Sequence, residues 1–349
     1  MTSRSNGAPL LEVAHVRKVF SNTGGLLSAQ DVVALDDVSL MLQGDEAKLL
    51  TIVGESGSGK STLARCILGL TPITEGSIRY RGQEISQMNR TALHEYRRAV
   101  QPVFQDPYAT YNPFYRIDRV LNMIVRKFKL ASSTSEATKL IDEALRAVDL
   151  RPHDVLGRYP HQLSGGQRQR IMVARALLLN PKIILADEPV SMVDASLRAT
   201  ILESLLKLKR ELGISLVYIT HDLTTAYQVS ENIYILYRGS VAEVGSVDKV
   251  IKEPLHPYTQ LLVRSIPLPD PDLHWGGEGD LERKNQAANG AGSERRGCKF
   301  ADRCPFVMPE CRQSPPPLYR TNDDRAVACY LYKEHPVIRG GEMADVLAT

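Results

Sequence analysis

Residues 54–62 constrain this chain more than any other segment, because they form a glycine-rich loop between two regular elements. They read GESGSGKST and match the pattern G-x-x-x-x-G-K-[ST], with an apolar run at 49–53 before them and a helical pattern at 61–70 after them. Glycines let backbone N–H groups turn inward around phosphate oxygens, and the following helix adds the positive end of its dipole. The flanking strand and helix count against the alternative, a chance glycine-rich turn.

The segment therefore predicts a nucleotide-binding loop. Lys60 is expected to reach the β- and γ-phosphates, and the Ser61 hydroxyl is expected to coordinate Mg²⁺. The predicted nucleotide-contacting residues of the loop are Gly54, Glu55, Ser56, Gly57, Ser58, Gly59, Lys60, Ser61 and Thr62.

Strand and helix patterns alternate along the chain. Three apolar runs end at once in polar or glycine-rich residues, which is typical of strands buried on both faces of a parallel sheet. The runs are 49–53, 183–186 and 216–220, and helical periodicity fills 61–70, 137–148, 167–179 and 197–212. This alternation predicts an α/β architecture, in which ligands gather at the carboxyl ends of the strands.

Charged side chains follow the second and third apolar runs. Asp187 and Glu188 come directly after 183–186, and His221 comes directly after 216–220. Beside a phosphate loop, one carboxylate can hold Mg²⁺ and the other can polarise the water that attacks the γ-phosphate. A solvated acidic turn is the alternative for the pair, but the apolar strand and the loop at 54–62 favour the catalytic interpretation. His221 could donate to the γ-phosphate, although a lone histidine there is usually structural.

A second helix start follows the motif LSGGQ at 163–167. A serine followed by two glycines is typical of a helix N-terminus, where free N–H groups and the helix dipole bind anions. One chain thus carries two phosphate-binding helix starts. This combination resembles the ATP-binding-cassette (ABC) ATPases. The resemblance implies a P-loop NTPase fold of the ABC type, with a mixed sheet core and a helical signature subdomain from about 105 to 180.

In that family two ATPase subunits sandwich two nucleotides, each between the phosphate loop of one subunit and the LSGGQ of the other. The resemblance implies that Gln105 and Asp187 contact Mg²⁺, that Glu188 is the general base, and that His221 is the switch histidine; the expected catalytic residues are thus Glu188, His221 and Gln105. Further positions that match nucleotide-contacting residues are Phe20, Ser164, Gly165, Gly166, Gln167 and Asp194. Phe20 would stack on adenine, and a plain strand-edge aromatic is the alternative.

Two further segments resemble the ATPase subunits of oligopeptide and dipeptide importers: QDPYATYNP from residue 105 and HPYTQLLVRSIPLPDP at 256–271. The resemblance implies an ATPase that powers peptide uptake from the cytoplasmic face of the membrane, as a peripheral subunit. Its implied partners are a second, homologous ATPase, two transmembrane permease subunits and an extracytoplasmic solute-binding protein. Some members of this group carry oligosaccharides or metal chelates, so the solute stays open. A non-transport ABC ATPase is disfavoured, because no sustained heptads separate the two motifs.

Composition excludes other classes. Lys and Arg total 43 against 40 Asp and Glu, and the basic residues of the tail alternate with acidic ones, so no nucleic-acid partner is expected. No apolar window is long enough to span a bilayer, and the first residues lack the apolar run of a signal peptide. The mature chain is therefore expected to stay in the cytosol.

Four of the five cysteines lie within the last 52 residues, with the spacing C-x5-C-x6-C-x17-C. They are Cys298, Cys304, Cys311 and Cys329. A reducing compartment argues against disulfides, so the crowding indicates a metal or cluster site. Close C-x2–4-C pairs typical of zinc are missing, whereas looser spacing suits an iron–sulfur cluster; zinc and free thiols stay open. The resemblance implies a [4Fe–4S] cluster. Cys66 is expected to be a small buried apolar residue.

The predicted domain organisation follows from these segments. Residues 1–265 are expected to form the ATP-binding domain. A proline- and glycine-rich stretch at 266–296 is predicted to be a linker, because it has too few large apolar residues to bury a core. Residues 297–349 are expected to form a small Cys-rich C-terminal extension.

Overall fold

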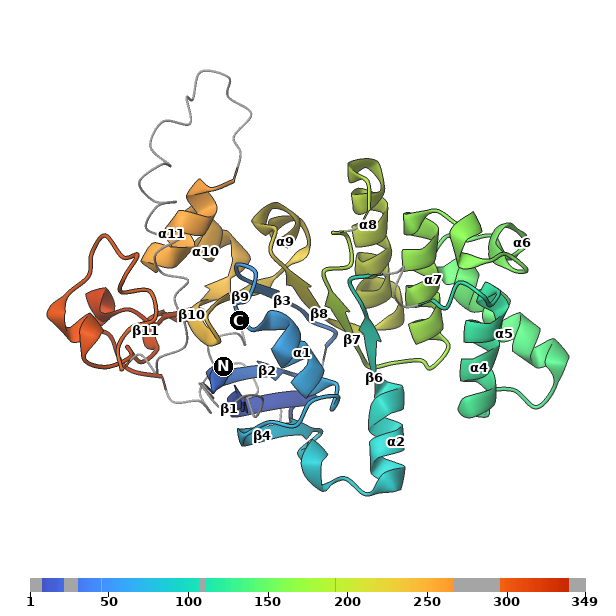
Figure 1. Cartoon of the computed structure of the whole chain (residues 1–349), viewed down its shortest axis with the longest axis horizontal. Coiled ribbons are helices and arrows are strands. Elements are labelled where there is room, and N and C mark those ends of the chain that lie inside the picture. Colours follow the sequence, from blue (N-terminus) through green and yellow to red (C-terminus); the bar gives the residue numbers. More distant parts are fainter. Residues whose placement is uncertain are drawn as a thin grey trace, which may run out of the picture. The chain divides into compact units, whose positions relative to one another are not determined.

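Figure 1 shows the computed structural model of the chain, which describes residues 8–21, 31–44, 46–106, 111–191, 193–266 and 296–338. The chain forms two compact units. The first comprises Met1–Gln43, Leu50–Ser86 and His221–Thr349, and the second comprises Gly44–Leu49 and Gln87–Thr220. Among the described helices, none combines the length and the apolar character that crossing a bilayer requires.

The first unit contains an antiparallel sheet of four strands in the order β2-β1-β4-β5. The strands are β1 Leu11–Phe20, β2 Val32–Leu42, β4 Glu75–Tyr80 and β5 Gln83–Glu84. Leu11 lies opposite both Leu42 and Tyr80, and register shifts interrupt both ladders of β1. Apolar residues of β1 and β2 such as Val16 and Leu35 are fully buried, so burial of one face stabilises this sheet.

A second group of strands in this unit carries the phosphate loop. Strand β3 Leu49–Val53 pairs in parallel with β9 Asn232–Tyr237, and β9 pairs antiparallel with β10 Ser240–Ser246. The tail adds β12 Arg325–Val327 against β10 and then β11 Tyr319–Asn322. The helices of the unit are α1 Lys60–Ile67, α9 Leu223–Val229, α10 Val247–Lys252 and α11 Pro257–Arg264. Short 3-10 turns occur at Ile85–Gln87, whose last residue belongs to the second unit, and at Pro309–Arg312 and Tyr330–Tyr332.

A buried ion pair fixes the tail to the first unit. Arg325 of β12 donates two hydrogen bonds to Glu243 Oε1 of β10, at 3.0 and 2.5 Å, and the two side chains are 2% and 0% exposed. The backbone N–H groups of Leu255 and His256 donate to the same carboxylate, at 3.1 and 2.9 Å. Arg325 also donates to the carbonyl of Glu253. Because a buried charge is tolerated only when it is paired and hydrogen-bonded, this site requires both partners.

The second unit contains three parallel strands in the order β8-β7-β6. They are β6 Val100–Val103, β7 Ile183–Asp187 and β8 Ser215–Thr220. Ile183 lies opposite both Val100 and Ser215, so the three strands start level with one another. Helices of this unit are α2 Arg90–Ala99, α4 Ile117–Lys127, α5 Thr134–Ala147, α6 Pro152–Val155, α7 Gly165–Leu177 and α8 Ala195–Leu212, with a 3-10 turn at Pro160–Gln162.

The predicted strands and helices agree with these bounds to within a few residues, and the α/β class with a mixed sheet is confirmed. Residues 267–295, most of the predicted linker, lie outside the described residues. The described part of the tail belongs to the first unit, because β12 extends its sheet. The small Cys-rich C-terminal extension is therefore not confirmed as a separate part of the chain, and the predicted boundaries at 265 and 296 stay a prediction.

Candidate functional site

The phosphate loop connects β3 to α1 within the first unit. Gly57 and Gly59 have φ of 78° and 101°, in the left-handed region that favours glycine. A Cβ at Gly54 would come within 2.2 Å of the carbonyl oxygen of Leu236, so the chain needs glycine there as well. Helix α1 starts after Gly59 without a capping side chain among the described residues. Its first N–H groups and its dipole can therefore face an anion.

Lys60 lies inside this loop and is 5% exposed. Its Nζ donates to the carbonyls of Gly54 at 2.7 Å and Glu55 at 2.9 Å, and to Ser58 Oγ at 3.3 Å. These bonds hold the ammonium group within the turn of the loop, where it can meet phosphate oxygens. Ser61, the predicted Mg²⁺ ligand, is exposed at the start of α1.

Two other predicted residues of the first unit are also accessible. Phe20 ends β1 opposite Val32 and is 44% exposed, with Lys18 Nζ 4.8 Å from its ring centroid. His221 directly follows β8 and is exposed. An exposed ring is compatible both with stacking on adenine and with a strand-edge aromatic, so that assignment stays a prediction.

In the second unit, the LSGGQ motif starts helix α7 as expected from its sequence. Ser164 Oγ accepts from the N–H of Gln167 at 3.2 Å, and Gln167 Oε1 accepts from the N–H of Ser164 at 3.0 Å. This reciprocal capping box fixes the exposed Ser164 at the tip of a 13-residue helix. A Cβ on the buried Gly166 would come within 2.9 Å of Leu197 Cδ1, so glycine lets α7 approach α8.

Glu188 and Gln105 contact each other in the same unit, although 83 residues separate them in the sequence. Gln105 Nε2 donates to Glu188 Oε2 at 2.9 Å. The Glu188 backbone has φ of 46°, a conformation that is costly for a non-glycine residue, and its N–H donates to Ile219 O at 2.8 Å. Its carbonyl accepts from the Ser191 N–H at 3.2 Å. The surrounding turn thus holds this carboxylate in one orientation.

Helix α7 also supports the glutamine. The N–H of Phe104 donates to Met172 Sδ at 3.0 Å, and Gln169 Nε2 donates to the Phe104 carbonyl at 3.4 Å. The helix that begins with LSGGQ therefore anchors the residue next to Gln105. Asp187 ends β7 directly before Glu188, and Asp194 is the exposed N-cap residue of α8.

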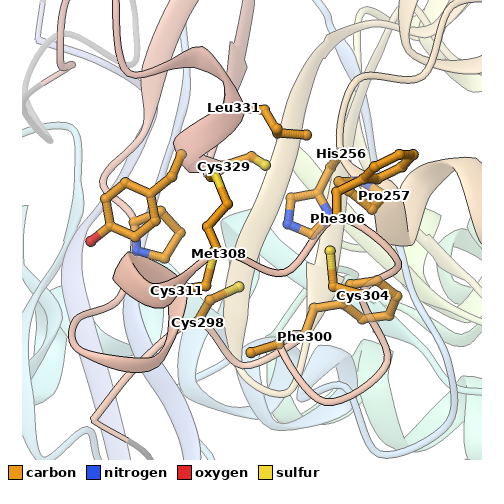
Figure 2. A pocket seen from close by; sticks show the side chains of 13 residues that line it. His256, Pro257, Cys298, Phe300, Cys304, Phe306, Met308, Cys311, Cys329 and Leu331 are labelled. Carbon is orange, nitrogen blue, oxygen red and sulfur yellow. The ribbon is translucent and has the colours of Figure 1, made fainter.

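The four tail cysteines line one pocket, which Figure 2 shows together with His256, Phe300 and Phe306. All four are free thiols, and their side chains point toward a common space. No described set of three or more His, Cys, Asp or Glu side chains has an arrangement suited to a metal ion. The predicted cluster is therefore not borne out as a preformed ion site, although its four cysteines do lie together.

Burial and mutual repulsion make thiolates costly in this pocket. Burial raises the pKa of Cys298 and Cys304, and burial together with the other three cysteines raises the pKa of Cys329 to about 12. Backbone N–H groups oppose this rise: those of Phe300, Phe306 and Leu331 hydrogen-bond to Cys298, Cys304 and Cys329 respectively. A positively charged centre between the sulfurs would favour the thiolate forms of Cys298, Cys304 and Cys329. Cys66 is buried on α1, as expected.

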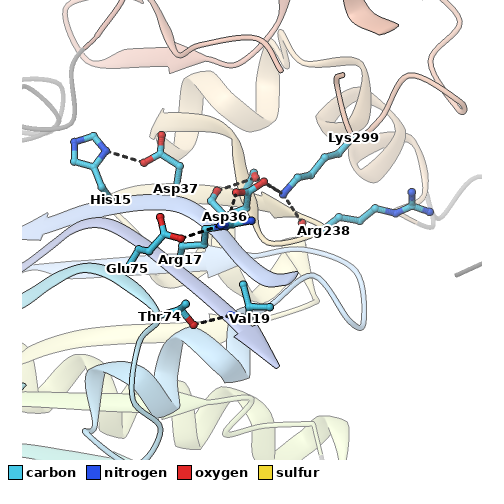
Figure 3. Close-up of polar contacts among 10 residues, drawn as sticks. His15, Arg17, Val19, Asp36, Asp37, Thr74, Glu75, Arg238 and Lys299 are labelled. Atoms are coloured by element: carbon cyan, nitrogen blue, oxygen red, sulfur yellow. Dashed lines mark hydrogen bonds and ion pairs between the residues drawn. The ribbon is translucent and has the colours of Figure 1, made fainter. Parts of the chain in front are cut away.

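Sequence reasoning missed the residues that attach the tail to the nucleotide-binding strands. Figure 3 shows Lys299, whose Nζ lies 2.8 Å from Asp36 and donates to Arg238 O at 3.0 Å. Arg303 pairs with Glu55 of the phosphate loop, and Tyr258 accepts from the Glu55 N–H at 2.9 Å. The two contacts of Glu55 span 203 and 248 residues along the chain, and no local pattern in the sequence marks them.

Comparisons with known proteins agree with this fold and these motifs. Residues 35–191 match the family model described as ABC transporter, and residues 242–311 match the model described as oligopeptide/dipeptide transporter, C-terminal region. The solved dimer of the ATP-binding cassette MJ0796 bound to ADP and Pi superposes with a TM-score of 0.59 and 32% identity, over 68% of this chain and 98% of that one. The fold and its motifs thus define an ABC-type ATPase.

Relatives that match most of this chain indicate which kind of ABC ATPase it is. The putative oligopeptide transport ATP-binding protein YkfD of Bacillus subtilis is 39% identical over 93% of this chain and 96% of its own length. The oligopeptide transport ATP-binding protein OppF of Salmonella typhimurium is 38% identical over 88% and 92%. This chain belongs to the ABC transporter ATP-binding proteins, in the family of the oligopeptide transport ATP-binding proteins.

Proposed function

We propose that this chain is the ATP-hydrolysing subunit that powers uptake of oligopeptides or dipeptides through a membrane ABC importer. The observation that carries the proposal is the pair of helix starts built for anions on one chain: α1 after the glycine-rich loop and α7 after the capped LSGGQ. The relatives named as oligopeptide transport proteins support the peptide substrate. An oligosaccharide or a metal chelate is the alternative solute.

In this proposal the loop 54–62 holds the phosphates of ATP. The N–H groups of the loop and of α1 donate to phosphate oxygens, and Lys60 supplies the positive charge. Phe20 stacks on the adenine. The nucleotide bound by a second ATPase subunit is contacted by the accessible start of α7 and by the residue before α8. The contacting residues are Ser164, Gly165, Gly166, Gln167 and Asp194.

Glu188 is the proposed general base that accepts a proton from the attacking water. The amide of Gln105 orients its carboxylate, as the 2.9 Å contact supports. His221 is proposed to donate to the γ-phosphate. Ser61, Asp187 and Gln105 offer the oxygen donors that Mg²⁺ prefers, and bound Mg²⁺ would offset phosphate charge during hydrolysis.

The proposed assembly contains a second, homologous ATPase, two transmembrane permease subunits and an extracytoplasmic solute-binding protein. This chain would act as a peripheral subunit at the cytoplasmic face of the membrane. The two-ATPase arrangement is supported by the accessible N-terminus of α7. In this proposal that N-terminus binds a nucleotide held by the phosphate loop of the second ATPase subunit.

The transporter purified from membranes with its companion subunits tests the proposed function. A peptide-loaded binding protein is expected to raise the ATPase rate of the reconstituted complex at least severalfold, whereas a sugar-loaded binding protein from another importer is not. As a control, Lys60→Ala should weaken ATP binding at least tenfold, because the loop loses its buried phosphate-pairing charge. Stimulation by an oligosaccharide or a metal chelate instead would replace the peptide assignment.

We further propose that Cys298, Cys304, Cys311 and Cys329 hold a [4Fe–4S] cluster, with zinc as the alternative. Their fit rests on the shared pocket, on the raised pKa values that a cationic centre would reverse, and on backbone N–H groups aimed at the sulfurs. When bound, such a cluster would cross-link four points of the tail, so its expected role is structural.

Cysteine substitution distinguishes these possibilities. The purified protein is expected to be brown and to contain about four iron and four sulfide per chain, the content of one such cluster. Cys304→Ala should lose the colour and most of the iron, whereas Cys66→Ala, at a buried cysteine of α1, should retain both. Colourless parent protein with one zinc per chain would establish the zinc alternative.

A further inference from the structure

Arg303 projects from a turn of the tail that packs into the core of the first unit. The turn is closed by the N–H of Ala301 donating to Cys298 O at 3.1 Å and the N–H of Arg303 donating to Phe300 O at 3.0 Å. Phe300 is 2% exposed and packs against Tyr237 and Tyr258, with ring centroids 5.3 and 5.6 Å away. The base of the Arg303 side chain is therefore held in place.

The guanidinium of Arg303 pairs with the carboxylate of Glu55 in the phosphate loop. Its two terminal nitrogens donate to the two carboxylate oxygens at 2.9 and 3.0 Å, in the bidentate geometry that makes such pairs strong. The side chain is only 11% exposed, and its charged end lies 5.8 Å from the Tyr237 ring and 5.5 Å from the Phe300 ring. The aromatic rings cover the guanidinium, whereas the Glu55 side chain is 39% exposed.

Every polar group of Glu55 is engaged by a neighbour. Its N–H donates to Tyr258 Oη at 2.9 Å, and its carbonyl accepts from Lys60 Nζ at 2.9 Å and from the Ser58 N–H at 3.1 Å. Glu55 therefore contributes both the carboxylate that pairs with Arg303 and the carbonyl oxygen that holds the Lys60 ammonium. A displaced Glu55 would displace Lys60, and an unpaired Glu55 would place a negative charge on a loop built for phosphate.

We propose that Arg303 is a positioning residue for ATP binding, which neutralises Glu55 and fixes the phosphate loop from the cysteine-bearing tail. This inference rests on the proposed function of loop 54–62. Arg303 does not touch the nucleotide in this scheme. It acts through Glu55, so its effect depends on the glutamate being charged.

A double-mutant cycle with the purified full-length protein tests this dependence. Arg303→Met is expected to raise the Kd for a non-hydrolysable ATP analogue about tenfold, because about one unit charge near the phosphates is left unpaired. Adding Glu55→Gln should bring the Kd back to within about threefold of the parent, since the repelling charge is gone. Arg303→Lys should fall between the parent and Arg303→Met, because an ammonium supplies charge without the bidentate fork.

The matched control is Arg312→Met, an exposed arginine of the same tail, which should leave the Kd unchanged. Iron content and visible absorption should be the same in Arg303→Met as in the parent, which separates this effect from loss of the cysteine site. A Kd for Arg303→Met within twofold of the parent would overturn the proposal. So would a double variant as weak as Arg303→Met, since that result would assign Arg303 a purely steric role. If Lys60→Ala also binds ATP normally, the proposed function of the loop fails first.

Discussion

Glu188→Gln is expected to lower the steady-state ATPase rate of the assembled transporter at least about a hundredfold, while ATP still binds. Glutamine keeps the shape of the side chain but cannot accept a proton, and general-base catalysis typically contributes about 10²- to 10⁴-fold. The Gln105 contact of 2.9 Å can be kept by the new amide oxygen, so the local geometry survives. Initial rates of phosphate release, measured beside equilibrium binding of ATP, separate the two effects.

The matched control for this experiment is Glu203→Gln, the same substitution at an exposed glutamate of α8 whose partner Arg210 lies 3.6 Å away. It should leave both rate and affinity within twofold of the parent, because exposed ion pairs contribute little. If Glu188→Gln turned over ATP at a rate comparable to this control, Glu188 could not be the proton acceptor.

The second large effect is expected on stability. Arg325→Met should lower the free energy of unfolding by about 3–5 kcal/mol, because it leaves the Glu243 carboxylate buried without its counter-charge. Both side chains are almost fully buried, so water cannot replace the lost partner. The loss of stability is measured as the shift of the urea unfolding midpoint, followed by far-ultraviolet circular dichroism.

Two variants make this result specific. Arg210→Met removes a surface arginine of an ion pair and should cost less than about 1 kcal/mol. Glu243→Gln in the Arg325→Met background should recover part of the loss, since a neutral amide is cheaper to bury than a carboxylate. Equal midpoints for Arg325→Met and Arg210→Met would show that the buried pair contributes no more than a surface one.

Local patterns predicted the elements that bear the chemistry. The run at 49–53 coincides with β3, and Ser164 caps α7 as its residue type suggests, because strand burial and helix capping depend on neighbours a few residues away. The antiparallel sheet of β1, β2, β4 and β5 escaped prediction, since its strands are irregular and β1 is bulged against both partners.

Long-range polar pairs could not be predicted from the sequence for a different reason. Glu55 and Arg303 are 248 residues apart, and Glu243 and Arg325 are 82 apart. The sequence holds 43 basic residues, and nothing in it distinguishes the two arginines that pair with these glutamates from the other basic residues. Only the fold decides which charges lose their hydration and must find a partner.

The pairing of β12 with β10 also bears on where the protein can be cut. A shortened chain that stopped before the tail would leave Val244 and its neighbours with a bare row of peptide N–H and carbonyl groups, and Glu243 without a cation. Bare strand edges recruit other strands and promote aggregation. We therefore expect removal of the tail to destabilise the nucleotide-binding module, and exchange of modules between related proteins should carry both segments together.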